Sequence, residues 1–175
     1  METNYLIEQI LQYYKEYLQK DFEKYRNHVY RVYLLCTALD TDPGKKDKYA
    51  IASVFHDLGI WTNKTFDYLE PSISLANDYL SKQNKSAWQT EIRLMIDMHH
   101  KMTRYNGEFE ETVEVFRKAD WIDVSKGFVR FGLDKGKIRQ VTRQFPTKGF
   151  HRFLLKKTFI NFLSHPFNPL PMFKR

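Results

Sequence analysis

The chain has 175 residues, 42% of them hydrophobic and 16% aromatic, with a formal net charge of +7 and one cysteine, Cys36. This composition excludes an intrinsically disordered chain and an internal disulfide, and the length is typical of one domain with a single core. No apolar run approaches the roughly 20 residues of a membrane-spanning helix, and the N-terminus lacks the pattern of a signal peptide. We therefore expect a cytoplasmic protein without a membrane span.

The first half of the chain has the pattern of four helices, because apolar residues recur every three or four positions. The first helix is predicted from about residue 4 to residue 20. Asp21 can cap a second helix, which ends near the turn signal at residues 41–44. A third, strongly apolar helix covers residues 48–57, and Pro71 suits the first turn of a fourth.

The second half of the chain continues the helical pattern. It predicts a fifth helix over residues 87–101 and a sixth over 109–124, followed by basic helical segments at about 134–144 and 148–163. The tail beyond them contains three prolines and is expected to be irregular. No strand-like alternation and no internal repeat interrupt this pattern. The sequence therefore predicts an all-α fold, a single compact domain over residues 1–175 with about seven to eight helices.

Four ionisable side chains interrupt otherwise apolar helices and are the candidates for a chemical site. They are His28, His56, Asp57 and Asp120. Burying such groups costs free energy unless they are paired or bind a metal ion. Two imidazoles and two carboxylates from three helices form a mixed nitrogen and oxygen site, which suits Zn, Mn, Fe, Co or Ni better than an ion that prefers thiolates. In the alternative interpretation, the histidines are core residues paired with the aspartates, without a metal.

The order of these residues resembles the HD superfamily of metal-dependent phosphohydrolases. The flanking residues agree with it, in the segments His28-x-x-Arg31-Val32, Phe55-His56-Asp57-Leu58-Gly59 and Ala119-Asp120-x-x-Asp123. The resemblance covers about residues 23–124, the motif core, and leaves the basic part at 126–175 unexplained. It implies that His28, His56, Asp57 and Asp120 hold one divalent ion (Mn, Zn, Fe, Co, Ni or Mg). It also implies a catalytic role for Asp57, which would orient the activated water or accept its proton.

His99 and His100 are the candidates for a second metal site. Some HD proteins use further histidines in this part of the chain, and they generally add another between the His-Asp pair and this position. No histidine lies between Asp57 and His99, and Glu70 is a substitute by location alone. We therefore expect one metal ion, with His100 and Lys101 contacting substrate phosphate and His99 as a core residue.

Several further residues are candidates for substrate contacts. Arg31, Arg104 and Lys118 can bind phosphate, since guanidinium and ammonium groups complement anionic oxygens. The alternative for each is a plain surface charge. Trp61, just past the His-Asp turn, is the tryptophan placed to stack on a base.

The C-terminal part is strongly basic. Residues 126–175 contain twelve Lys and Arg against one acid, Asp134, which gives a formal charge of +11. The other 125 residues carry 16 basic and 20 acidic side chains, which gives −4. This asymmetry predicts an anionic partner such as phosphate, nucleotide, nucleic acid or a membrane surface. The alternative is a solvated basic face without a partner.

Taken together, these features predict a divalent-metal-dependent phosphohydrolase that cleaves a phosphomonoester or phosphodiester bond in a small phosphorylated or nucleotide substrate. One alternative is a di-iron oxygenase of the HD type, against which the missing third histidine argues. Another is a non-catalytic HD module that binds nucleotide or nucleic acid. Single-strand binding needs basic and aromatic residues together, but the helical spacing of the phenylalanines in the basic part is more typical of core residues. These are Phe128, Phe131, Phe145, Phe150 and Phe153.

Overall fold

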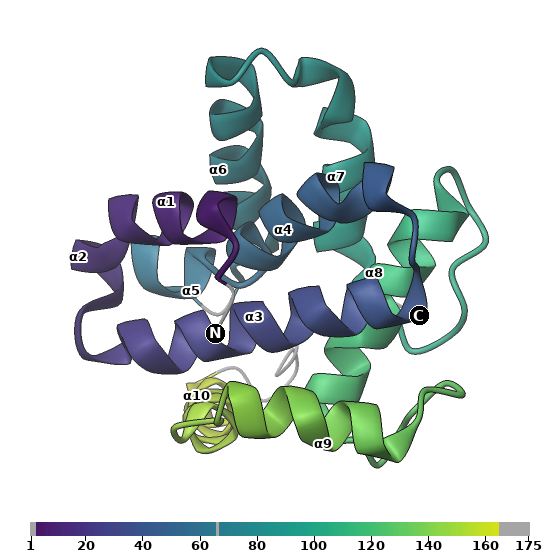
Figure 1. Cartoon of the computed structure of the whole chain (residues 1–175). Coiled ribbons are helices and arrows are strands. Elements are labelled where there is room, and N and C mark those ends of the chain that lie inside the picture. Colours follow the sequence, from purple (N-terminus) through teal and green to yellow (C-terminus); the bar gives the residue numbers. More distant parts are fainter. Residues whose placement is uncertain (1–2, 66, 165–175) are drawn as a thin grey trace.

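The computed structural model describes residues 3–65 and 67–164, and within these ranges its regular elements are helices without strands (Figure 1). In chain order they are α1 (Tyr5–Tyr13), α2 (Lys15–Leu18), α3 (Phe22–Leu39), α4 (Lys46–Phe55), α5 (Gly59–Thr62), α6 (Leu69–Lys82), α7 (Gln89–Met98), α8 (Glu110–Val124), α9 (Lys135–Gln144) and α10 (Phe150–Ser164). Short 3-10 turns precede α3, α4 and α7. Eight of the helices have nine residues or more. The predicted all-α fold is confirmed.

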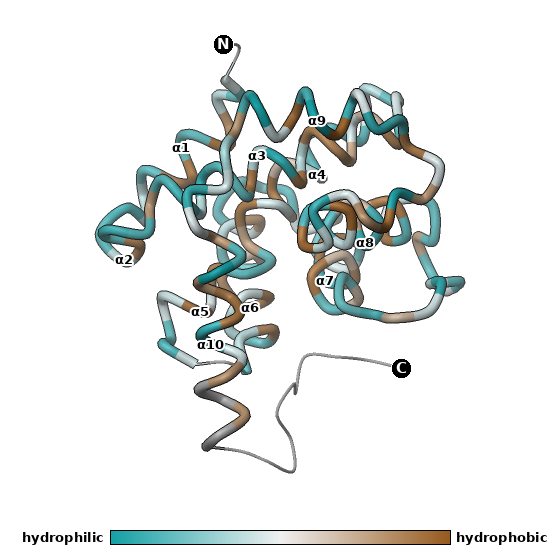
Figure 2. The backbone as a smooth tube through the Cα atoms, turned by 90° about the horizontal axis from the view of Figure 1, so that it is seen from below, coloured by the Kyte–Doolittle hydropathy of each residue, from teal (hydrophilic) through white to brown (hydrophobic). Residues whose placement is uncertain are grey.

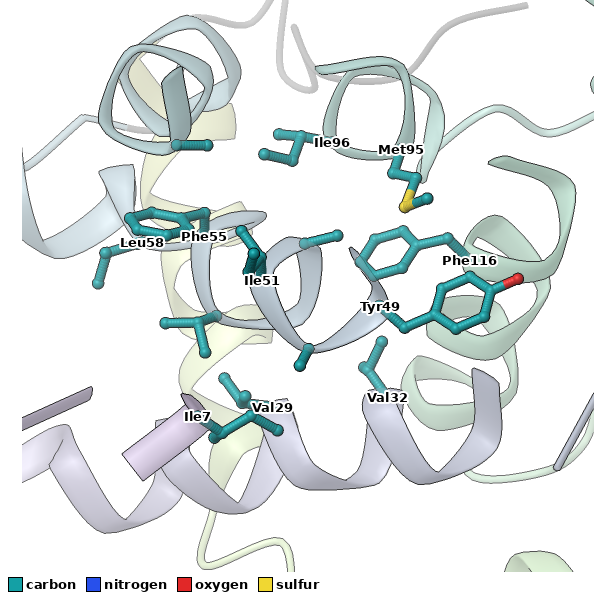
Figure 3. Close-up of a cluster of buried hydrophobic side chains, with 14 of the residues drawn as sticks. Ile7, Val29, Val32, Tyr49, Ile51, Phe55, Leu58, Met95, Ile96 and Phe116 are labelled. Atoms are coloured by element: carbon teal, nitrogen blue, oxygen red, sulfur yellow. The ribbon is translucent and has the colours of Figure 1, made fainter. Parts of the chain in front are cut away.

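Helix α4 lies at the centre of the core. Its residues from Tyr49 to Phe55 are all buried, which is the pattern of a helix that other helices surround. Figure 3 shows Ile51 and Phe55 of α4 among apolar side chains of its neighbours. Val29 and Val32 approach from α3, and the other labelled neighbours come from α1, α7 and α8: Ile7, Met95, Ile96 and Phe116. The helix that leads into His56 and Asp57 is therefore held in place by side chains of α1, α3, α7 and α8.

Helix α3 is the long helix against which α4, α8 and α9 pack (Figure 1). Its apolar residues recur through Tyr25, Val29, Val32 and Cys36, all without exposed surface. Because α8 and α9 cover other sides of the same helix, polar residues of α3 are buried too. Among them are His28 and Arg31, each 0% exposed.

The described portion of the basic part, residues 126–164, contacts the same core. The phenyl ring of Phe145, which follows α9, stacks on Tyr30 at a centroid distance of 4.4 Å. Figure 2 shows hydrophilic and hydrophobic positions alternating along α9, and Ile138 and Val141 are the buried ones. Phe128 is 91% exposed, so the interpretation of the phenylalanines as core residues does not hold for all of them.

The helix boundaries agree with the sequence pattern except at the N-terminus. The first predicted helix divides at Tyr14 into α1 and α2. Asp21 occupies the N-cap position of α3, but its carboxylate makes no hydrogen bond to the start of the helix and accepts from Lys24 and from the indole of Trp61 instead. The irregular tail predicted at residues 165–175 lies outside the described residues. Among those that are described, no helix has the length and apolar character needed to cross a membrane.

Candidate metal centre

The candidate ligands come from four parts of the fold. His28 lies in the middle of α3, His56 and Asp57 directly follow α4, and Asp120 lies on α8. His99 directly follows α7. All five side chains are buried, with at most 4% of any residue exposed. The structure therefore brings the four predicted ligands and His99 into the interior of the molecule.

The two imidazoles of the predicted set face each other. The Nε2 atoms of His28 and His56 are 2.9 Å apart, and Asp57 Oδ2 lies 3.5 Å from the first and 3.4 Å from the second. Asp120 Oδ1 lies 3.7 Å from both Nε2 atoms. His28, His56 and Asp57 thus form one group of potential ligands, and Asp120 approaches its two imidazoles from α8.

The opposite nitrogen of each histidine is held by an acceptor. His28 Nδ1 lies 2.7 Å from the carboxylate of Asp123. His56 Nδ1 lies 2.9 Å from the carbonyl oxygen of Ser53, and His99 Nδ1 lies 2.6 Å from that of Ile96. A carbonyl oxygen only accepts, so these Nδ1 atoms carry the hydrogen and the lone pair of each neutral ring is on Nε2. This anchoring of Nδ1 is typical of histidines that bind a metal through Nε2.

This arrangement leaves two lone pairs in close contact. With neutral rings, Nε2 of His28 and Nε2 of His56 would repel each other at 2.9 Å. A proton on one of them removes the repulsion, and so does a metal ion bound to both. The donor set of imidazole nitrogen and carboxylate oxygen is one that divalent transition metals accept.

A second group of potential ligands shares Asp57 with the first. One ligand atom each of Asp57, His99 and His100 lies within 4.8 Å of the others. Asp57 Oδ1 is 3.6 Å from His99 Nε2, and both atoms are buried without a hydrogen-bond partner. Such unsatisfied polar atoms are rare in protein interiors, and a metal ion bound to both would satisfy them. The two oxygens of Asp57 thus face different groups of histidines.

The pKa values of the histidines diverge because their surroundings differ. Burial alone would lower the pKa of His28, but hydrogen bonds and charges from Asp123 and Asp57 outweigh it and raise the pKa to about 9. Burial, together with the positive charges of His28 and His99, lowers the pKa of His56 to about 3. A buried pair of imidazoles therefore holds one proton rather than two at neutral pH.

The carboxylates diverge in the same way. Burial opposes ionisation of Asp57, but its contacts with His56, His28 and His99 hold its pKa well below the usual range. Burial raises the pKa of Asp120 to about 6, with repulsion from Asp57 adding to it. Asp57 is therefore the fixed negative charge of the site.

Arg31 supports the site from behind and does not face a substrate. Its guanidinium donates to both carboxylate oxygens of Asp123 and to the carbonyl oxygen of Phe145. The Arg31 side chain is fully buried and already paired with Asp123. In this structure it therefore supports the site and does not make the predicted contact with a substrate phosphate. Asp123 holds His28, so Arg31 acts on the candidate ligand through Asp123.

Of the other predicted substrate contacts, His100 belongs to the second ligand group, and Lys101 directly follows it in the chain. Both are half-buried, and the Nε2 atom of His100 is 2.6 Å from the hydroxyl of Tyr68. Glu70 is exposed in the first turn of α6 and belongs to neither ligand group. Trp61 is buried and stacks on Phe153, so its ring is not free for a base.

Arg104 and Lys118 are surface charges paired with glutamates, which is the alternative to a contact with phosphate. Arg104 pairs with Glu110, and its side chain is 76% exposed. Lys118 lies 3.6 Å from Glu114 of the preceding turn.

Three residues with contacts at the centre were not given roles from the sequence. The ring of Phe150 stacks on His28 at a centroid distance of 4.0 Å, and His151 Nε2 contacts the carbonyl oxygen of Asp123 at 2.9 Å. Asp123 itself follows Asp120 by one helical turn, which is the signal that places both on one face of α8. No comparable signal marks Phe150 and His151, because their partners at the centre are more than 25 residues away in the sequence.

Comparison with protein-family models, with curated proteins and with solved structures finds no match for the chain. The class of the site therefore follows from its own side chains. It is a buried centre of histidines and carboxylates that can hold a metal ion.

Proposed function

We propose that the chain is a divalent-metal-dependent phosphohydrolase of the HD type, which cleaves a phosphomonoester or phosphodiester bond in a small phosphorylated or nucleotide substrate. The order of His28, His56-Asp57 and Asp120 supports the proposal, and so does the buried cluster of His28, His56 and Asp57, with Asp120 3.7 Å from both imidazoles. The observation that carries the proposal is the pair of unsatisfied buried atoms, Asp57 Oδ1 and His99 Nε2, 3.6 Å apart beside the two facing imidazoles. A metal ion bound to both atoms would satisfy them, as a proton shared by His99 and Asp57 also would.

In this proposal each residue of the centre has one task. His28, His56, Asp57 and Asp120 hold the ion, and a divalent ion there would supply activation of water and polarisation of a phosphoryl oxygen. Asp57 stays ionised because its pKa is held low, so it can also orient the attacking water. His100 and Lys101, which are half-buried and directly follow His99 in the chain, would bind the phosphate of the substrate.

The test combines metal analysis with hydrolysis. The purified chain is analysed for bound metals and assayed on phosphomonoesters, cyclic nucleotides and dinucleotides. Asp57→Asn should lose metal affinity by more than the roughly 10- to 100-fold typical of residues that only position ligands, and hydrolysis should fall with it. Asp78→Asn is the matched control, since Asp78 is exposed on α6. Full metal content and activity in Asp57→Asn, with helical circular dichroism unchanged, would refute the proposal.

One observation favours a second candidate, the di-iron oxygenase. Asp57 directs its two oxygens at two groups of histidines, which is how a carboxylate bridges two ions. Metal analysis of the same sample separates the candidates. Two irons per chain, with oxygen consumption and no phosphate release, would favour the oxygenase, whereas hydrolysis with a redox-inert ion such as Zn²⁺ would exclude it.

A further inference from the structure

A groove of about 880 Å³ lies on the other side of Trp61 from the metal centre. Its walls come from the junction of α2 and α3, from α5 and the residues after it, and from α10, which lies beside α5 in Figure 2. Six cationic side chains line it, and we call it the basic groove. They are Lys20, Lys24, Lys64, Arg152, Lys156 and Lys157.

The charge of the basic groove is almost uncompensated. Among the described residues that line it, Asp21 supplies the carboxylate. That carboxylate is already bound by Lys24 Nζ at 2.7 Å and by the indole of Trp61 at 3.0 Å. Within the described ranges, Arg152 and Lys156 form no ion pair. Segments that are distant in sequence thus bring like charges together, which costs free energy unless an anion is bound.

One aromatic ring organises the ammonium groups. Phe153 stacks on Trp61 with ring centroids 5.1 Å apart and an interplanar angle of 10°. Lys24 Nζ lies 5.1 Å from the centroid of Phe153, and Lys157 Nζ lies 5.8 Å from it. Contacts of this kind hold cations in place over a ring face. The ammonium groups of Lys24 and Lys157 are therefore positioned before a ligand arrives.

The basic groove is separate from the metal centre. Tyr25 lies between them, with its ring centroid 4.6 Å from that of Trp61 and 6.3 Å from that of His28. Among the described lining residues there is no candidate metal ligand. An anion in the groove would therefore be held by lysine and arginine alone.

From this geometry we infer that the basic groove binds a small oligophosphate. Six cations around one concavity match a compact ligand with several negative charges better than a single phosphate. Single-stranded nucleic acid needs free aromatic faces and a basic track. Here Trp61 and Phe153 cover each other, Tyr17 is the lining aromatic residue that is exposed, and the basic residues of α9 do not line the groove. The inference does not depend on the metal or on hydrolysis.

The test measures binding of sodium tripolyphosphate by calorimetry at low salt, with protein stripped of metal on a chelating resin. Arg152→Glu with Lys156→Glu reverses two exposed groove charges one turn apart on α10. Lys135→Glu with Arg139→Glu is the matched control, because these residues are exposed with the same spacing on α9. Circular dichroism of both double variants checks that they fold.

We expect one tripolyphosphate per chain, at least about tenfold weaker binding in the α10 variant, and a change of less than about threefold in the α9 variant. Inorganic phosphate should bind at least about tenfold more weakly than tripolyphosphate. Equal weakening by both variants, or no binding of tripolyphosphate by the wild type, would overturn the inference. A single-stranded oligonucleotide that binds more tightly, and that both variants weaken equally, would assign the basic residues to nucleic acid instead.

Discussion

Asp123 connects the candidate metal centre to the rest of the protein. Its carboxylate binds His28 and Arg31, and its carbonyl oxygen is in contact with His151 of α10. Contacts with Arg31 and His28 hold the pKa of this carboxyl far below its usual range, although it is buried. Asp123 therefore remains charged and fixes the orientation of the His28 ring.

The pairing of Arg31 with Asp123 leads to a prediction about stability. Arg31→Met should lower the free energy of unfolding by about 3–5 kcal/mol, because the buried carboxylate of Asp123 loses its guanidinium partner and keeps only its contact with His28. Urea denaturation followed by circular dichroism measures this change. Arg104→Met removes an exposed ion pair and should change the free energy of unfolding by less than about 1 kcal/mol. If the two variants were equally stable, Arg31 would not be the partner on which the buried carboxylate depends.

The pKa of His28 leads to a prediction about pH. In the metal-free chain this pKa is raised from 6.5 to about 9, so the proton stabilises the folded state fully below pH 6.5 and this contribution is lost as pH rises through 9. A metal ion must displace the same proton. Metal affinity should therefore rise up to about tenfold per pH unit below pH 9 and level off above it.

Calorimetry in two buffers with different heats of ionisation measures the proton that is released with each metal ion. The control is Asp57→Asn, which should release none because it should not bind the metal. Affinity that stays constant between pH 7 and 8.5 would contradict the prediction.

Among the helices, the sequence predicts those that carry a complete apolar stripe and a start or stop signal. The segment at 109–124 corresponds to α8, and the segment at 134–144 to α9, where Asp134 caps the helix by accepting from the backbone N–H of Lys137. The division between α1 and α2 is not predicted, because the apolar pattern continues through it. Tyr14 lies at the boundary between the two helices and Leu18 at the end of α2, and both are buried.

The candidate site is predicted as a set of residues but not as a geometry. Polar residues on apolar helices identify His28, His56, Asp57 and Asp120. His99 has the same apolar surroundings and looks like a core residue, and only the fold shows that its Nε2 faces Asp57. The partner of Arg31 lies 92 residues away. A helical pattern gives the face on which a side chain lies, but it does not give the element that meets that face.

For the whole molecule, the centre links elements that are far apart in the sequence. Its candidate ligands belong to α3, to α8 and to the segments that follow α4 and α7. A bound ion would therefore join the central helix of the core to three others. Ion binding to the folded chain alone shifts the unfolding equilibrium by mass action.

Metal should therefore raise the melting temperature. At a free ion concentration about 100 times the Kd, the added stability is about 2.7 kcal/mol, which corresponds to roughly 5–10 °C for a chain of this size. Thermal circular dichroism with and without Mn²⁺ or Zn²⁺ measures the shift, and a chelator should reverse it. Asp57→Asn should show none. An equal shift in that variant would place the stabilising ion elsewhere.

The burial of the candidate ligands should also slow the exchange of a bound ion. His28, His56 and His99 have no exposed surface, and Phe150 stacks directly on the first of them. Local separation of the helices is therefore expected when an ion, or the proposed substrate, reaches these nitrogens, so the rate of ion exchange follows the rate of that opening as well as the strength of the ligand bonds. An ion captured during folding would exchange slowly with ions in solution, and a chelator would remove it over the time of these openings. The metal found in the purified protein would then reflect the supply of ions at synthesis, before equilibrium selects among them.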